Sequence, residues 1–168
     1  MKLIKYPDPI LSTKCAEVVN GDEKTSEILN EMSQKLYEWS GAGLAAPQVG
    51  ILKRMVAIDI RETPSQLYKL INPQIVWKSE KMIESNEGCL SLPILRVEIL
   101  RHESVVVEYL DDNFVKRRVT ANGFLSCCLQ HELDHLDGIL YIDRLSKLKK
   151  SRAIKKFEKL QMEEQGEK

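Results

Sequence analysis

The chain has 168 residues, 43% of them hydrophobic and 30% charged, and its 25 basic and 25 acidic side chains balance to zero net charge. This length and composition predict a single globular domain over residues 1–168. They exclude a membrane-spanning segment, because no apolar run approaches about 18 residues. The N-terminus also lacks the apolar segment of a secretory signal. We therefore expect a cytoplasmic protein, or one in an equivalent organellar compartment, with no membrane or DNA partner and with its four cysteines reduced.

The first predicted element is an amphipathic helix near the N-terminus. It should begin at a cap, Thr25 or Ser26, and end near Ser40-Gly41. Its apolar positions recur at helical spacing: Ile28, Leu29, Met32 and Leu36.

Short β-type runs follow, and the turn signals between them include Asn72-Pro73 and Pro93. The runs are 55–58, 67–71, 75–77 and 105–109. A second helix is expected from about 123 to 137, with Asn122 as its cap and Gly138 as its stop. A third, basic helix should cover about 146–162. This order predicts an α+β fold, with mainly antiparallel sheets around the second helix and a helix toward each end of the chain.

The second helix carries the sequence His131-Glu132-Leu133-Asp134-His135. Residues four apart lie on the same face of a helix, so the two histidines can present nitrogens to one metal ion, with Glu132 beside it. The rest of the helix is apolar, and two histidines with a glutamate are costly to bury there without a partner. The alternative is a pair of hydrogen-bonded core histidines with a solvated glutamate. The pattern favours a metal-dependent hydrolase.

A catalytic metal site needs a third protein ligand and an open position. A third histidine three residues after Gly138 is excluded, because that position is Tyr141. Glu158 is available downstream, but it lies in the strongly basic last helix. Cys89 lies in a polar, glycine-containing segment, unlike Cys127 and its neighbour Cys128, and is the best candidate.

Three separated segments resemble the motifs of one family, the peptide deformylases. Residues 41–48, GAGLAAPQ, resemble its first motif; residues 87–91, EGCLS, its second; and residues 130–135, QHELDH, its third. The opening Tyr6-Pro7-Asp8-Pro9 is also similar to the start of family members. One departure follows the second motif: family members often have glycine after the proline, where this chain has Ile94.

The resemblance implies that Cys89, His131 and His135 bind the metal, which in the family is typically Fe(II) and is replaceable by Zn, Ni or Co. Glu132 would be the general base and then the general acid. Gln48 and the backbone N–H of Leu90 would stabilise the oxyanion. The implied reaction is removal of the N-formyl group from the initiator methionine of nascent peptides, in which a metal-bound water attacks the formyl carbonyl and formate is released.

Seven residues are candidates for the substrate pocket. Phe124 and Cys127 share the face of His131 on its helix, although each could equally be a core residue. Arg96 could bind substrate, but it and Arg101 are by default surface charges. The full set is Ala42, Gly43, Glu87, Gly88, Arg96, Phe124 and Cys127. His102 is expected to be structural, and Cys15 to be buried filler.

The C-terminal residues 145–168 carry eight basic side chains against four acidic ones. Such a run is usually a solvated helix face. The resemblance implies a second role, because in bacterial members of the family a C-terminal helix docks on the ribosome. The ribosomal phosphates would attract this positive charge.

Two other functions are consistent with parts of the pattern. An HExxH peptidase would cleave internal peptide bonds instead of a formyl amide. A catalytically silent homologue or structural metal protein should have lost Glu132 or Gln48, or gained a fourth ligand, and neither change is apparent.

Overall fold

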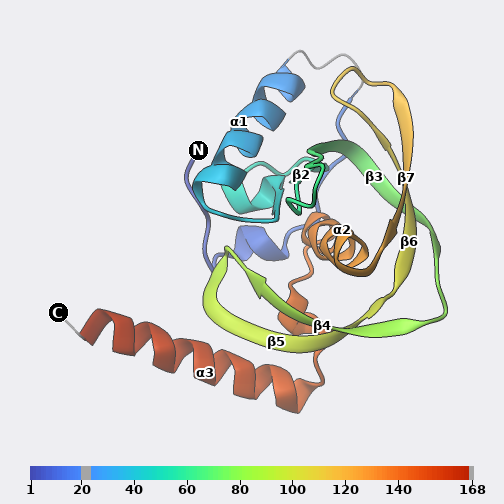
Figure 1. The fold of residues 1–168 in the computed structure, drawn as a ribbon. Helices are drawn as coiled ribbons and strands as arrows, with labels where there is room; N and C mark the ends of the chain where they lie inside the picture. The colour runs from blue at the N-terminus through green and yellow to red at the C-terminus, as the bar shows by residue number, and fades with distance from the viewer. Residues whose placement is uncertain (20–23, 167–168) are drawn as a thin grey trace.

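The computed structural model describes residues 1–19 and 24–166. It confirms the predicted α+β class: over these residues, three α-helices and three short 3-10 helices accompany antiparallel β-sheets (Figure 1). The helices are α1 (Lys24–Glu38), α2 (Gly123–Leu136) and α3 (Lys147–Gly166), and the 3-10 helices are η1 (Pro9–Ser12), η2 (Ala46–Val49) and η3 (Tyr141–Arg144). The strands are β1 (Gly43–Ala45), β2 (Met55–Ile58), β3 (Tyr68–Lys78), β4 (Met82–Cys89), β5 (Leu92–His102), β6 (Ser104–Leu110) and β7 (Lys116–Asn122).

The strands form two sheets that enclose α2. A five-stranded antiparallel sheet has the order β1-β2-β3-β6-β7, and β4 with β5 forms a separate two-stranded sheet. Figure 1 shows α2 in the centre, with β6 and β7 along one side and the β4–β5 pair below it. The helix packs its apolar face on the large sheet, and three of its polar residues contact the small one: Gln130, His131 and Asp134.

The apolar face of α2 explains its central position. Leu129, Leu133 and Leu136 are buried in one core cluster with sheet residues such as Val56 and Val107. Fully burying a leucine side chain contributes about 1.5–3 kcal/mol, so these contacts outweigh the modest helix propensity of the histidines. Gly138 has φ +72°, the left-handed conformation expected where the helix stops.

The first helix differs from the prediction at both ends. It begins at Lys24, so Thr25 and Ser26 lie inside its first turn, and neither is the cap. The hydroxyl of Ser26 instead donates to the backbone of Asp112, and the helix ends at Glu38, two residues before the predicted Ser40-Gly41. The predicted apolar face is correct in its main residues: Leu29, Met32 and Leu36 are fully buried.

The turn expected at Asn72-Pro73 is wrong, because β3 continues through it. Asn72 has φ +49°, and the register of β3 against β6 shifts after Ile71, so the strand is distorted there without ending. The side chain of Asn72 exchanges two hydrogen bonds with the backbone of Val18, which stabilises the distortion. The β4–β5 hairpin was not predicted, since Met82–Cys89 has mostly polar and partly exposed residues.

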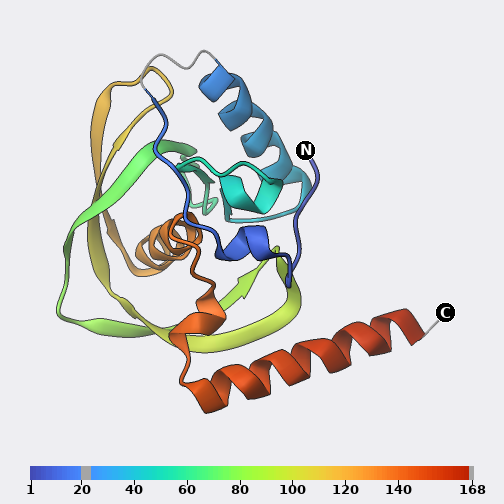
Figure 2. The same cartoon turned by 180° about the vertical axis from the view of Figure 1, so that it is seen from behind.

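The last helix lies outside the body of the protein along β5, as both views show (Figure 2). Its Ala153 and Phe157 are buried against Leu92 and Leu95 of β5. It continues to Gly166, four residues beyond the prediction, because Glu and Gln in that stretch are good helix formers. None of the described helices combines the length and apolar character that crossing a membrane would require.

Candidate metal centre

Four side chains from two elements meet between α2 and the β4–β5 sheet. His131, Glu132 and His135 come from α2, and Cys89 is the last residue of β4. One nitrogen of each histidine and the sulfur of Cys89 lie within 4.8 Å of one another. The Cys89 Sγ is 3.3 Å from the Nε2 of His135. The structure thus brings together the two histidines that helical spacing paired and the cysteine that the sequence favoured as third ligand.

The donor set fits a metal ion. The Nδ1 of His131 is 2.7 Å from a carboxylate oxygen of Glu87, so its Nε2 remains for coordination. Burial lowers the pKa of His135 well below its ordinary value, which keeps this ring in the neutral form that binds metals. Three ligands of the S, N and N type beside a cleft match a catalytic site with an open position rather than a closed structural one.

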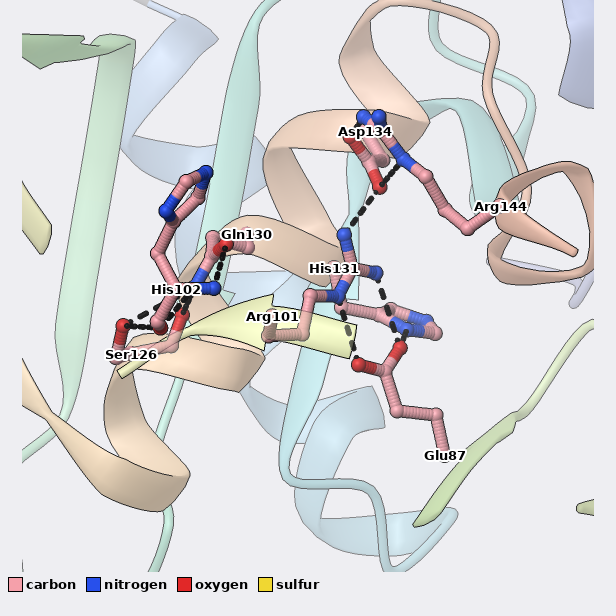
Figure 3. A network of polar contacts seen from close by, with 8 residues as sticks. All are labelled: Glu87, Arg101, His102, Ser126, Gln130, His131, Asp134 and Arg144. Carbon is pink, nitrogen blue, oxygen red and sulfur yellow. Dashed lines mark hydrogen bonds and ion pairs between the residues drawn. The ribbon is translucent and has the colours of Figure 1, made fainter. Parts of the chain in front are cut away.

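A buried ion-pair network reaches the Nδ1 side of His131 through Glu87 (Figure 3). Arg101 lies between two carboxylates: its Nε donates to Glu87 at 2.8 Å and its Nη1 to Asp134 at 2.6 Å. Arg144 also binds Asp134. Although burial opposes it, hydrogen bonds from His131 and Arg101 lower the pKa of Glu87 to about 2. Glu87 is therefore ionised and fixes the orientation and tautomer of the His131 ring.

The default assignment of Arg101 as a surface charge is wrong, since Arg101 is only 3% exposed. Its burial follows from strand alternation: on β5, Leu95, Ile99 and Arg101 all point to the interior. Reading β5 with a period of two would have placed an arginine inside, where it requires carboxylate partners. Asp134 was also missed as a partner, because its contact with Arg101 spans 33 residues.

Glu132 lies at the cleft with an unusual environment. It is 5% exposed, and its Oε2 has no hydrogen-bond partner among the described residues. Burial raises its pKa to about 7, which suits a group that must accept and return a proton near neutral pH. A β-carbon built on Gly43 would fall 2.3 Å from its Oε1, so only glycine leaves room for this carboxylate.

Gln48 is held in a fixed orientation next to the metal ligands. Its Oε1 accepts a hydrogen bond from the backbone N–H of Ala45 at 2.9 Å. Its Nε2 donates to the hydroxyl of Ser91 at 3.1 Å and to the sulfur of Cys89 at 3.4 Å. Gln48 is 1% exposed. The Gln48 amide therefore lies beside Cys89 of the metal centre, and Leu90 lines the same cleft.

The cleft has a volume of about 620 Å³. All seven residues proposed for a substrate pocket line it: Ala42, Gly43, Glu87, Gly88, Arg96, Phe124 and Cys127. These residues differ in whether their side chains are free to contact a substrate. Both oxygens of Glu87 are occupied by Arg101 and His131, so Glu87 orients a ligand and has no free group for substrate. Phe124 is 58% exposed and therefore not a core residue.

Other sequence expectations concern residues beside the centre. His102 is structural, as expected: its Nδ1 is 2.7 Å from the backbone oxygen of Ser79, and Gln130 bonds to its backbone (Figure 3). Cys15 is buried filler in the main core. Tyr141 occupies the position where a third histidine ligand would have been required. The centre of its ring lies 5.6 Å from that of His131, and its hydroxyl donates to the backbone oxygen of Leu95.

Comparison with known proteins gives one consistent family. The sequence model of the polypeptide deformylase family matches residues 1–151. A peptide deformylase of Rickettsia akari is 41% identical over 167 residues, covering 95% of each chain. One from Thermodesulfovibrio yellowstonii is 45% identical over 161 residues, covering 94% of this chain and 96% of its own. The crystal structure of the Ehrlichia chaffeensis peptide deformylase in complex with actinonin superposes with a TM-score of 0.89 at 36% identity, covering 95% of this chain and 96% of its own.

Proposed function

Since this chain belongs to the peptide deformylase family, we propose that Cys89, His131 and His135 are its metal ligands and Glu132 its general base and acid. The enzyme is a metal-dependent hydrolase that removes the N-formyl group from the initiator methionine of nascent polypeptides and releases formate. The observation that carries the residue assignment is the Cys89, His131 and His135 cluster, with Glu132 on the same helix and in the same cleft.

The proposed metal is Fe(II), and Zn, Ni or Co are expected to replace it in purified protein. When bound, a divalent cation would supply Lewis acidity, which polarises a carbonyl oxygen and lowers the pKa of water to about 7. A thiolate ligand donates charge and suits iron better than a third hard ligand would. Cys89, at the surface of the cleft, would also make the site sensitive to oxidation.

Glu132 moves the protons of the reaction. Its buried carboxylate takes a proton from the attacking water, and the same group returns that proton to the leaving amine of methionine. Gly43 leaves this carboxylate space to do so, because it has no side chain there.

Gln48 and the backbone N–H of Leu90 stabilise the oxyanion that forms on the formyl group. The Gln48 amide is held before substrate arrives by Ala45 and Ser91. Fixed donors of this kind contribute roughly 3 kcal/mol each to transition-state stabilisation in other enzymes. The hydrogen bond to Ser91 was not predicted from the sequence, and it explains how a flexible side chain can be preorganised.

The methionine side chain occupies the apolar part of the cleft in this proposal. Ala42, Phe124 and Cys127 supply apolar surface, with Gly88 and Arg96 at the opposite wall on the β4–β5 hairpin. Methionine is flexible and polarizable, so an apolar slot without polar partners is sufficient to bind it.

The test is anaerobic purification, metal analysis and a formate-release assay with formyl-methionyl peptides. Three ligands around one centre predict about one metal per chain. The family predicts formate release without internal cleavage. Cys89→Ala should lose the metal, while Cys127→Ala, which removes a sulfur outside the ligand cluster, should keep it. Internal peptide cleavage without formate would favour the HExxH peptidase and contradict the proposal.

The last helix is proposed to contact the ribosome in the cytoplasm or an equivalent organellar compartment. Its buried face, with Ala153 and Phe157, is occupied by β5, so its basic residues face away from the body. The exposed basic side chains are Lys147, Lys149, Arg152, Lys155, Lys156 and Lys159. Their charge would favour phosphate-rich RNA near the site where formylated chains emerge.

A further inference from the structure

Residues 41–43 form one wall of the cleft, and the segment after β2 binds their backbone. The backbone N–H of Asp59 donates to the oxygen of Ala42 at 2.9 Å. The guanidinium Nη2 of Arg61 donates to the oxygen of Gly41 at 3.0 Å. The next residue, Gly43, touches Glu132. The position of this wall therefore decides how much space the carboxylate has.

The carboxylate of Asp59 organises a set of groups that we call the Asp59 network: Tyr37, Asp59, Arg61 and Ser65. Asp59 is 2% exposed and accepts from the hydroxyls of Tyr37 and Ser65, each at 2.7 Å. Its other oxygen accepts from the backbone N–H of Arg61 at 2.8 Å. Burial opposes ionisation, but the hydrogen bonds from Ser65 and Tyr37 hold the pKa of Asp59 below its ordinary value. The network therefore keeps a fixed negative charge beneath the wall.

Arg61 adopts a backbone conformation that few residues other than glycine tolerate. Its φ is +56°, and such a conformation is energetically costly for a residue with a β-carbon. The surrounding contacts offset this cost: the N–H binds Asp59, and the guanidinium lies 5.8 Å from the centre of the Tyr37 ring while it binds Gly41. Strain retained at one residue beside an active site is an observation that points to a functional role.

The wall has few other contacts to hold it. β1 has three residues and pairs with β2 only from Gly43 to Ala45, so Gly41 and Ala42 lie before the ladder begins. Two glycines in three residues also give this stretch unusual backbone freedom. The backbone N–H of Gly41 donates to the backbone oxygen of Leu36. The carbonyl oxygens of Ala42 and Gly41 accept from the segment after β2, through the N–H of Asp59 and the guanidinium of Arg61.

We propose that Arg61, held by the Asp59 network, is a positioning residue that sets the wall 41–43 against Glu132 and the bound formyl-peptide. This inference rests on the deformylase function given above. No side chain of the network is among the described residues that line the cleft, so Arg61 acts through Gly41. Removing its hydrogen bond to Gly41 should let the wall move and weaken substrate binding, while the metal ligands on β4 and α2 stay in place.

The experiment compares Arg61→Ala and Arg61→Lys with Arg117→Ala, whose exposed arginine pairs with Asp111 at 2.7 Å on the β6–β7 hairpin. Metal content, thermal midpoint, kcat and KM are measured for each holoenzyme with a formyl-methionyl peptide. Arg61→Ala should raise KM about fivefold, as expected for the loss of one hydrogen bond of ordinary net strength, with kcat and metal content near wild type and the thermal midpoint lowered by no more than about 2–4 °C. Arg61→Lys retains a donor and should restore part of the loss, and Arg117→Ala should resemble wild type.

An unchanged KM in Arg61→Ala overturns the inference, and so does a KM increase that is matched by metal loss or by a fall in the thermal midpoint well beyond about 4 °C. An equal KM increase in Arg117→Ala also overturns it, since the effect would then be one of surface charge. Absence of formate release from the wild-type enzyme would reject the proposed function itself, which is a separate result.

Discussion

Gly43 lies directly against the carboxylate of Glu132: the position that a β-carbon would take on this glycine is 2.3 Å from Oε1 and 2.7 Å from both Cδ and Cγ. These separations are far below van der Waals contact. The glycine of the first motif and the glutamate of the third are therefore one structural unit, although 89 positions separate them in the chain.

Gly43→Ala should displace the Glu132 carboxylate and lower kcat on the order of 10²-fold, the effect of a displacement of about 1 Å at a reacting group. The metal ligands should be unaffected, so metal content should equal that of wild type. Steady-state kinetics with metal analysis measure both. Gly166→Ala is the control, because nothing lies within 4 Å of the corresponding β-carbon. Full activity in Gly43→Ala would contradict the tight contact.

Glu132→Ala should keep the metal and lose turnover by about 10²–10⁴-fold, the usual contribution of a general acid–base. Formate release and metal analysis of the same sample separate the two properties. Glu158→Ala, which removes an exposed glutamate from α3, should have wild-type kinetics. Appreciable deformylation by Glu132→Ala would remove Glu132 from its proposed role.

Arg101→Met should reduce the free energy of unfolding by about 3–5 kcal/mol, because it leaves the carboxylates of Glu87 and Asp134 buried without their shared partner. Urea denaturation measures this change. Arg117→Met removes an exposed arginine with a comparable ion-pair distance, 2.7 Å, and should cost less than about 1 kcal/mol. Similar losses in the two variants would show that burial does not govern the strength of the Arg101 network.

Ile94→Gly should increase the free energy of unfolding by about 1 kcal/mol, since Ile94 has φ +64° and a β-branched residue is strained there. The side chain is 47% exposed, so little packing is lost. Ile94 is also the position at which family members often have glycine. Ile94→Ala is the control, because alanine keeps the β-carbon and should bring no such gain. Urea denaturation of both variants decides the matter, and equal stabilities would mean that the conformation carries no strain.

Neutralising basic residues on α3 should weaken ribosome binding. A triple variant of Lys149, Arg152 and Lys156 to Gln leaves the buried Phe157 in place, unlike a truncation after Asp143, which would also remove core packing. Co-sedimentation should fall at low salt, and the salt dependence should decrease by about one unit of slope for each phosphate that the variant no longer binds.

A second triple variant, of Lys2, Lys14 and Lys116 to Gln, provides the matched change in net charge, because all three lysines are exposed and lie outside α3. If both triple variants co-sediment alike, charge on α3 has no special role and the ribosome proposal is wrong.

The pairing of His131 with His135 and the placement of Glu132 could be predicted from the sequence, because the separation of residues four apart on a helix is set by local backbone geometry. The apolar face of α1 and the stop at Gly138 were predictable for the same reason. The family motifs then indicated the reaction. Each helix pattern and each single motif consists of residues close together in the chain.

Tertiary packing alone decided which distant residues complete the centre. Cys89 was a candidate from its polar segment and from the family motif, and the folding of β4 against α2 places its sulfur 3.3 Å from His135. The burial of Arg101 between Glu87 and Asp134 depends on the β4–β5 hairpin, whose partly exposed residues carry a weak strand pattern. The contact of Gly43 with Glu132 depends on the sheet that encloses α2. A local pattern determines spacing within an element, whereas contacts across elements are set by how buried surfaces pack, which no single segment encodes.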